Sequence, residues 1–340
     1  MANLRPESPA PASQEDLTQE REKDAPEVKG RPSPKKPRSE PGRQPGWVRV
    51  TPLFLSAILF LSGIFSVFCA LPLQVLSLQK RWKLLLLSLV LNSAWVILLG
   101  GFASFALYAV YGLVPGVLLG WLMGRGTSLT RSLAVTVAGM MTVAGGVVLG
   151  VAVYHQVSPF DEVRNQVSVF LRWMEVSLAP EARENLLGGM DPKDWSKAFL
   201  HELPSALILF ALAQAWLSAV FLLRANPGGI LGMKGLKPDL IRNWRVPDLW
   251  VWPTIACAVF MVFEIEQVTP WATNAFRVLM GLYALQGLAI LGAFLDAWKI
   301  RGFLRNAVYV GVLFLMMPLL LSVGFFDQWF DFRKKLRQST

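Results

Sequence analysis

The chain has 340 residues, of which 54% are hydrophobic and only 16% are charged, and the charges are crowded into a few stretches. A water-soluble domain needs charged residues over most of its surface, so this composition is that of a membrane protein. The formal net charge is +10, but the basic residues lie mostly beside apolar runs, where they anchor spans at anionic headgroups. We therefore expect the lipid bilayer as a partner. We expect no nucleic acid as a partner, because no nucleic-acid-binding motif is present.

Residues 1–50 form a polar tail that holds nine of the 22 prolines, with acidic residues dominating early and basic residues late. Such a segment cannot bury enough apolar surface to fold alone, so it is predicted to be disordered. It does not resemble a signal peptide, because the first apolar run begins only at Thr51. The tail is either an extension without specific function or a segment that docks on acidic lipid or on a partner.

Apolar runs bounded by charges, glycines and prolines predict an all-α, polytopic transmembrane helical bundle of about eight spans. The division of the second span from the third rests only on Gly100 and Gly101; the alternative is one long helix followed by a re-entrant segment. The predicted spans are residues 53–76, 84–99, 102–123, 131–153, 203–223, 249–267, 273–297 and 304–326. They form an N-terminal membrane half (51–153) and a C-terminal half (203–326), followed by an amphipathic basic tail (327–340).

Residues 154–202 separate the two halves and are predicted to be an amphipathic helical insertion outside the membrane. A first helix has its apolar residues on one face. These residues are Val163, Val167, Phe170, Leu171, Met174 and Leu178. A second helix is expected near Pro180, and a third near Pro192 with Asp191 as its N-cap. The insertion is either a helical cover for the bundle or a lid over a substrate.

Basic residues favour the cytoplasmic side of a membrane, and in an eight-span arrangement four basic loops fall on one side. We therefore expect a multi-pass membrane protein with these loops in the cytoplasm. The loop residues are Lys80, Arg81, Lys83, Arg125, Arg131, Arg224, Lys234, Lys237, Arg242, Arg245, Lys299, Arg301 and Arg305.

The same arrangement leaves the basic N-terminal tail and the C-terminal "RKKLR" on the outer side, against the same rule. At the front, the conflict disappears if residues 51–79 form a helical hairpin broken near Leu71 and Pro72. At the back, "FFDQWFDFRKKL" is expected to form an interfacial helix on either face, with Trp329, Phe330 and Phe332 at headgroup depth.

Two adjacent spans carry small residues at every fourth position, a glycine-zipper pattern that lets helix backbones approach closely in lipid. We expect the two stripes to pair in a tight antiparallel hairpin, or each to admit another helix. The stripes serve packing alone, or they border a partner subunit or a substrate cavity. The first consists of Gly112, Gly116, Gly120 and Gly124, and the second of Ala134, Ala138, Thr142, Gly146 and Gly150.

Polar side chains inside apolar runs are candidates for function, because burying them in lipid is costly. In "FEIEQ", Glu264 and Glu266 precede Arg277 across a turn, where they either pair with it or bind a cation or a substrate amine. Gln214 and Gln286 lie deeper, as interhelical hydrogen-bonding groups or in a polar cavity. If these five residues share a cavity, they favour substrate binding; if they are scattered, they favour a scaffold.

The sequence gives no support for redox, metal or catalytic chemistry. Cys69 and Cys257 lie in apolar runs, without a CxxC pair or a metal-ligand cluster. The chain lacks GxSxG, HExxH, a P-loop and a glycine-rich dinucleotide turn. We therefore expect no enzyme, no catalytic residue, no metal and no cofactor.

Three stretches together resemble the YybS-like family of predicted bacterial multi-spanning membrane proteins. They are "IRNWRVPDLWVW" (241–252, with Trp244, Arg245 and Pro247), "LQGLAIL" (285–291) and "FFDQWFDFRKK" (325–335). The pattern of spans is distantly similar to substrate-binding subunits of energy-coupling-factor transporters. That resemblance implies a small-molecule ligand near the outer face, although Ser62 and Ser66 are the nearest match to the Ala-x-x-x-Ala coupling element. The alternative function is a non-catalytic scaffold that recruits a cytoplasmic or envelope partner through its basic loops.

Overall fold

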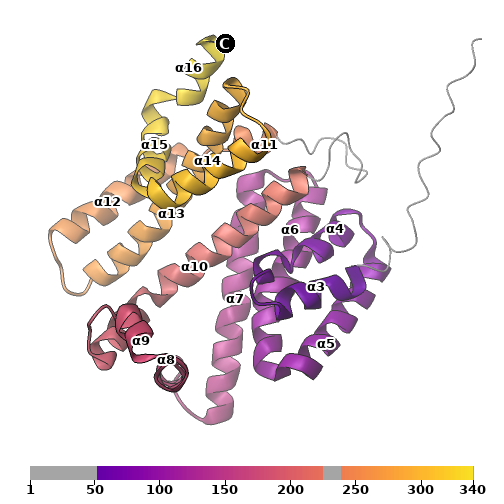
Figure 1. Ribbon diagram of the computed structural model, residues 1–340, viewed down its shortest axis with the longest axis vertical. Coiled ribbons are helices and arrows are strands. Elements are labelled where there is room, and N and C mark those ends of the chain that lie inside the picture. The colour runs from indigo at the N-terminus through magenta and orange to yellow at the C-terminus, as the bar shows by residue number, and fades with distance from the viewer. Residues whose placement is uncertain (1–51, 225–238, 340) are drawn as a thin grey trace, which may run out of the picture. The chain divides into compact units, whose positions relative to one another are not determined.

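The computed structural model describes residues 52–224 and 239–339 (Figure 1). Within these two ranges every regular element is helical. The chain divides into Met1–Pro45 and Gly46–Thr340, and all the elements below belong to the second unit. The predicted tail at 1–50 and the basic residues Lys234 and Lys237 lie outside the described residues.

Four helical stretches in the described part of the chain are long and apolar enough to cross a membrane. They are Trp82–Gly124, α7 (Leu129–His155), α10 (Pro192–Arg224) and α13 (Thr269–Ala297). A fifth is counted if α14 (Gly302–Leu315) and α15 (Met317–Phe330), which meet at 96°, form one broken span. The structure therefore gives four or five candidate spans, and the count of eight stays a prediction.

The first expected span, 53–76, is divided into α3 (Pro52–Leu61), a 3-10 turn η1 (Ser66–Phe68) and α4 (Leu71–Leu78). The Ser56 hydroxyl donates a hydrogen bond of 2.6 Å to the Cys69 carbonyl oxygen. Thirteen residues of straight helix would separate these groups by about 20 Å, so the chain turns back between them. This is the helical-hairpin alternative, except that the break precedes Leu71.

The chain turns back again at Gly101, inside α5 (Trp82–Tyr108). The Asn92 side chain accepts a hydrogen bond of 2.7 Å from the Ala57 N–H, and the hydroxyls of Tyr108 and Ser56 lie 2.6 Å apart. Asn92 and Tyr108 would be about 24 Å apart along a straight helix, yet both contact adjacent residues of α3. Gly101 has φ 75° and ψ −178°, a conformation that only glycine adopts readily. The expected second and third spans therefore meet at a sharp turn.

The glycine stripe of α6 (Val114–Gly124) packs against α4. A Cβ atom added at Gly116 would lie 2.7 Å from the Leu73 Cβ, and one at Gly120 would lie 2.5 Å from the Gln74 carbonyl oxygen. At Gly124 the nearest atom would be the carbonyl oxygen of Leu78, at 3.3 Å, whereas Gly112, in the π-helical segment η2 (Ala109–Leu113), contacts Tyr108 of the preceding turn. The glycines thus leave room for the backbone of α4.

The second stripe does not meet the first. α6 and α7 are neighbours, but they meet where Gly139 faces Leu118, because α4 already covers the glycine ridge. All five small residues of the α7 stripe are exposed: Ala134, Ala138, Thr142, Gly146 and Gly150. The expected pairing of the two stripes is therefore corrected by the structure: the first admits another helix, and the second faces outward.

The insertion forms α8 (Pro159–Ser177) and α9 (Pro180–Leu187), and its expected third helix continues into the fifth expected span as α10. Ser158 caps α8 by accepting a hydrogen bond of 3.1 Å from the Asp161 N–H. Asp191 likewise accepts one of 2.8 Å from the Lys193 N–H at the start of α10. These two caps satisfy N–H groups that have no partner within their own helix.

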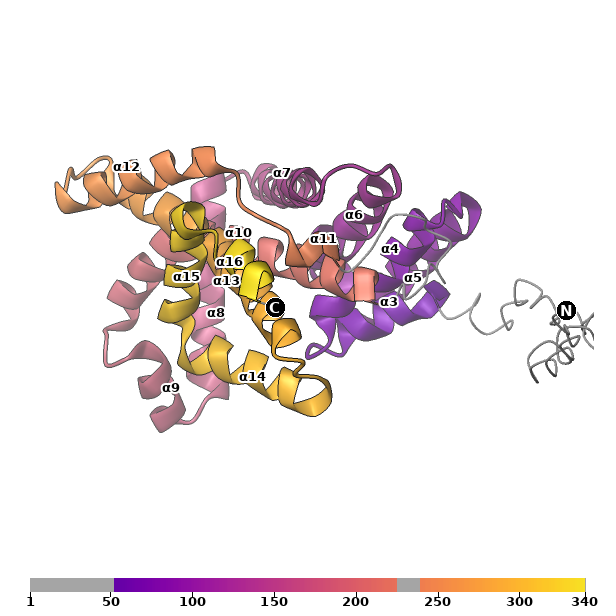
Figure 2. The ribbon, with the colours of Figure 1, turned by 90° about the horizontal axis from the view of Figure 1, so that it is seen from above.

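The C-terminal half runs through α11 (Asp239–Arg242), η4 (Asp248–Trp250) and α12 (Val251–Val262) to α13. The eighth expected span, 304–326, is not one helix: it breaks at Met316 between α14 and α15. α16 (Phe332–Ser339) ends the described chain. α15 packs across α13, as Figures 1 and 2 show.

We predict that Gly120→Ala destabilises the protein by about 1–3 kcal/mol, because the added methyl group overlaps the backbone of α4. Gly146→Ala is the matched control, because no atom lies within 4 Å of its added Cβ. It should leave stability unchanged or raise it by about 0.5–1 kcal/mol through helix propensity. Thermal unfolding in detergent measures both, and equal losses would contradict the packing of α6 on α4.

Candidate functional site: a buried polar network

Two glycines allow α13 and α15 to cross with their backbones in contact. A methyl group on Gly287 would overlap the carbonyl of Leu320, and one on Gly324 would overlap the carbonyl of Tyr283. The contact is therefore reciprocal, with each glycine facing a main-chain carbonyl of the other helix. Such close approach in an apolar bundle requires residues without side chains.

This crossing brings together two polar side chains that lie close to the glycines in the sequence. Gln286 precedes Gly287, and Asp327 lies three residues after Gly324; both side chains are fully buried. The Gln286 amide donates a hydrogen bond of 3.0 Å to the Asp327 carboxylate. The other carboxylate oxygen accepts one of 2.9 Å from the Phe332 N–H.

Arg333 completes the network from α16. Asp331 adopts a left-handed conformation with φ 43°, which ends α15 and lets α16 start in a new direction. The Arg333 guanidinium then donates to the Asp327 carboxylate at 2.7 Å, with only 7% of its surface exposed. It also donates to the carbonyl oxygens of Arg242 at 3.1 Å and Trp244 at 2.7 Å.

The loop between α11 and η4 is held by the same groups. The Val246 N–H donates to the Gln286 side chain at 2.8 Å, and the Gln328 amide donates to the Val246 carbonyl oxygen at 3.1 Å. Arg245 donates to the Gln328 carbonyl oxygen at 2.8 Å. The Trp244 indole N–H reaches Thr130 of α7 at 3.0 Å. The network thus connects α7, α13, α15, α16 and this loop.

The network has the contacts of a structural clamp. The charges of Asp327 and Arg333 cancel, and an unpaired buried charge would cost several kcal/mol. Each Asp327 oxygen already accepts a hydrogen bond, so the carboxylate has its partners inside the protein. The described residues contain no group of three or more His, Cys, Asp or Glu side chains that would hold a metal ion.

The same end of the bundle carries further ion pairs. Asp296, near the end of α13, pairs with Arg242 at 2.8 Å and with Arg305 of α14 at 2.5 Å. Because Arg333 binds the carbonyls of residues 242 and 244, the C-terminal basic helix lies beside this basic loop. The bent pair α14–α15 thus returns the chain to the end of α13 where it began, and the C-terminal "RKKLR" lies at the same end of the bundle as this basic loop.

The five residues of the substrate-binding hypothesis have separate partners. Glu264 and Glu266 are exposed at the turn between α12 and α13, and Arg277 pairs with Glu202 of α10 at 2.8 Å. Gln214 donates to the Tyr111 carbonyl oxygen at 2.7 Å. Gln286 belongs to the network. No hydrogen bond or ion pair recorded for the described residues joins any two of these five.

Gln214 and Asn274 both repair helix backbone next to a proline. Pro115 has no N–H to donate to the Tyr111 carbonyl, so the Gln214 amide supplies the hydrogen bond. Beside Pro204, the Asn274 amide accepts from the Ser205 N–H at 3.2 Å and donates to the His201 carbonyl oxygen at 2.9 Å. Gln214 and Asn274 thus act here as interhelical hydrogen-bonding groups.

Sequence reasoning missed Asp327, Arg333, Gly287 and Gly324. The signal was present in "FFDQWFDFRKK", where an acidic residue follows an apolar run and an arginine lies six residues later. An aspartate in that position is costly without a partner, so the pairing was open to prediction. The two glycines gave no signal, because they are single and far apart in the chain.

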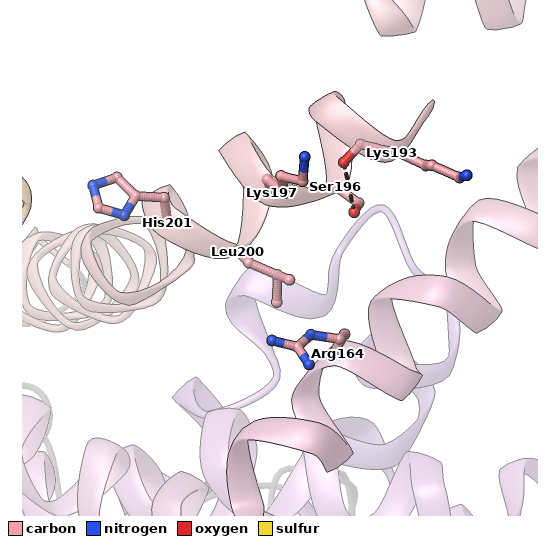
Figure 3. Close-up of a pocket in the computed structure, with 6 residues that line it drawn as sticks. All are labelled: Arg164, Lys193, Ser196, Lys197, Leu200 and His201. Carbon is pink, nitrogen blue, oxygen red and sulfur yellow. Dashed lines mark hydrogen bonds between the residues drawn. The ribbon is translucent and has the colours of Figure 1, made fainter. Parts of the chain in front are cut away.

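A separate hollow of about 580 Å³ lies on the insertion, between α8 and the first turns of α10 (Figure 3). Its lining is mostly basic and hydroxyl-bearing. The lining residues are Arg164, Lys193, Ser196, Lys197, Leu200 and His201.

A helical chain with four or five apolar helices long enough to cross a bilayer is a multi-pass membrane protein. Its sequence matches the model of the family described as "Predicted membrane protein (DUF2232)" over residues 50–328. The chain therefore belongs to the DUF2232 family of membrane proteins. No curated protein and no solved structure matches it. The resemblance to the YybS-like family and to energy-coupling-factor subunits stays a prediction.

The three stretches that carry that resemblance meet in the network. Residues 241–252 supply the clamped loop, 285–291 supply Gln286 and Gly287, and 325–335 supply Asp327 and Arg333. Segments that are separated by tens of residues in the sequence thus form one buried site.

We predict that Arg333→Met destabilises the protein by about 3–5 kcal/mol, because it leaves the buried Asp327 carboxylate without its ion-pair partner. The double variant Asp327→Leu/Arg333→Met should recover most of this loss, since it removes both charges. Lys335→Met, at an exposed position of the same helix, is the control. Thermal unfolding in detergent compares the three; a double variant no more stable than Arg333→Met would contradict the proposed role of the unpaired charge.

The junction between α7 and α8 should loosen in acid. The Glu162 carboxylate accepts hydrogen bonds from His155 at 2.9 Å and Gln166 at 2.7 Å, which lower its pKa. Because folding lowers the pKa of Glu162, its ionised form stabilises the fold fully above about pH 4.5. This stabilisation is lost as the pH falls through the pKa of the folded state. Limited proteolysis of the insertion between pH 6 and 3 measures this loss. Glu162→Gln should flatten the pH dependence; an unchanged profile would contradict the assignment.

Proposed function

We propose that the chain is a non-catalytic scaffold of the bacterial inner membrane that recruits a cytoplasmic protein through a rigid basic surface. The observation that supports this most directly is the buried Asp327–Arg333 pair, which fixes the loop before η4 and the start of α16 to the bundle. A buried ion pair contributes little net stability, and its best-attested use is to specify one arrangement of the chain.

The surface fixed in this way is basic. Lys299 and Arg301 are exposed in the turn after α13, and Lys334 and Lys335 are exposed on α16. Trp298, beside Lys299, is 66% exposed. Exposed tryptophan and arginine side chains are common at the centres of protein interfaces. We call Trp298, Lys299, Arg301, Lys334 and Lys335 the basic end.

The partner that fits the basic end is a protein with an acidic surface. Flexible basic segments bind anionic lipid without fixed geometry, so attraction to the bilayer alone does not require a buried clamp behind them. A protein interface does benefit, because side chains held in place lose less entropy on binding. The positive-inside rule assigns such a surface to the cytoplasm.

Substrate capture is the alternative, and it has less support. A cavity shared among five residues would favour substrate capture. These residues are Glu264, Glu266, Arg277, Gln214 and Gln286. Their contacts are instead separate and mostly interhelical. Scattered positions of this kind favour the scaffold.

The test is photo-crosslinking in cells with full-length protein carrying a photoreactive residue at position 298. The double variant Lys299→Glu/Arg301→Glu should reduce the crosslinked partner about ten-fold or more, because like charges then face each other. Lys83→Glu, at an exposed position in the first turn of α5, is the matched control and should have little effect.

Mass spectrometry of the purified protein separates the two functions. A stable protein partner that dissociates as salt is raised supports the scaffold. A co-purifying small molecule that is lost on Glu264→Ala, without any protein partner, would overturn the scaffold in favour of capture.

A further inference from the structure

The hollow on the insertion gathers basic side chains from two helices. Arg164 extends from α8 towards Leu200, while Lys193, Lys197 and His201 leave successive turns of α10 in different directions (Figure 3). Its volume of about 580 Å³ is within the range of small-molecule sites. These residues make no contact with the buried network, so this is a second, separate site.

The cations of the hollow are available to a ligand. Arg164 pairs with Asp161 at 3.3 Å and Lys197 with Asp194 at 3.1 Å, but all four side chains are more than half exposed. Such pairs within one exposed helix contribute little, so an anion of higher charge density can replace the carboxylate. No carboxylate of the described residues lies within ion-pair distance of Lys193.

Groups other than Lys and Arg cations also line the hollow. The Ser196 hydroxyl lies in the lining and donates a hydrogen bond of 3.0 Å to the Lys193 carbonyl oxygen. The Ser196 oxygen can still accept a hydrogen bond, and the hydroxyl can donate to a ligand in place of Lys193. His201 adds a ring nitrogen. Guanidinium, ammonium and hydroxyl groups together are the set that binds phosphate oxygens, with Arg164 able to make a bidentate contact.

Aromatic side chains lie on the same two helices as the hollow. Phe170 stacks with Trp173 at 5.9 Å and with Trp195 at 6.5 Å, and Trp195 stacks with Phe199 at 4.9 Å. Trp173 is 57% exposed. Aromatic rings with adjacent basic groups are enriched at headgroup depth, where the rings contact apolar lipid and the basic groups contact anionic headgroups.

The sequence of α10 also places the hollow at headgroup depth. The helix is polar from Pro192 to Glu202 and apolar from Leu203 onward, so its boundary falls directly after His201. A group bound beside Lys197 and His201 would therefore lie where lipid phosphates lie.

We propose that the hollow between α8 and α10 binds a phosphate group, supplied by the headgroup of an anionic lipid. Arg164 of α8 contacts the phosphate oxygens, and Lys193, Lys197 and His201 of α10 add to the positive potential. Asp161, Asp191 and Asp194 border the site, and a bound phosphate would displace the first and third from their cations. The bound lipid fixes the insertion against the membrane.

The test uses the full chain in neutral detergent, titrated separately with dioctanoyl phosphatidylglycerol, dioctanoyl phosphatidylcholine and inorganic phosphate. Native mass spectrometry counts bound lipid, and thermal shift reports each titration. We expect saturable binding of phosphatidylglycerol that Arg164→Gln/Lys197→Gln weakens about ten-fold or more. Arg172→Gln is the matched control, because this residue is an exposed arginine of α8 outside the hollow.

Each outcome decides the proposal. Binding of inorganic phosphate alone, lost in the double variant, would keep the phosphate site but assign a soluble source. Equal binding of phosphatidylcholine, equal weakening by Arg172→Gln, or no binding of any probe would overturn it. Partner crosslinking at position 298 should be unchanged in the double variant, so that failure here is distinguishable from failure of the scaffold function.

Discussion

The reciprocal contact of Gly287 and Gly324 is the constraint on which the C-terminal half depends. Because each glycine faces a backbone carbonyl of the other helix, α13 and α15 approach closely enough for Gln286 to reach Asp327. A larger residue at either position would separate the helices and leave both polar groups buried without partners. The close packing of the two helices and the hydrogen bond between Gln286 and Asp327 therefore depend on each other in this apolar bundle.

Arg333 extends this local contact into long-range order. Its side chain neutralises Asp327 and also holds the carbonyls of Arg242 and Trp244. The loop before η4, the end of α15 and the start of α16 are thus fixed together, and basic residues from distant parts of the chain collect at one end. That collection agrees with the rule that places positive charge in the cytoplasm, and it gives the proposed scaffold a surface of fixed shape.

Glycine has several distinct uses in this protein. At Gly101 it provides a backbone conformation that turns the chain back, and at Gly120 it makes room for the backbone of α4. On α7 the small-residue stripe is exposed, and a Cβ atom added at Gly146 would meet no atom of the described chain within 4 Å, although the spacing equals that of α6. Spacing alone therefore identifies a surface suited to close packing, but it does not identify what packs there.

The sequence by itself determined the class of protein and its local features: apolar helices, the amphipathic helix at α8 and the Asp191 cap, whereas it left a turn at Gly100–Gly101 as one of two alternatives. Each follows from composition or from residues a few positions apart, which is the range over which helix periodicity and capping act. The tertiary structure alone decided that α4 fills the glycine ridge, that Gln214 and Gln286 have different partners, and that Asp327 meets Arg333, Arg242 and Trp244. These contacts join residues far apart in the chain, and their energies depend on which helices cross, so no local pattern specifies them.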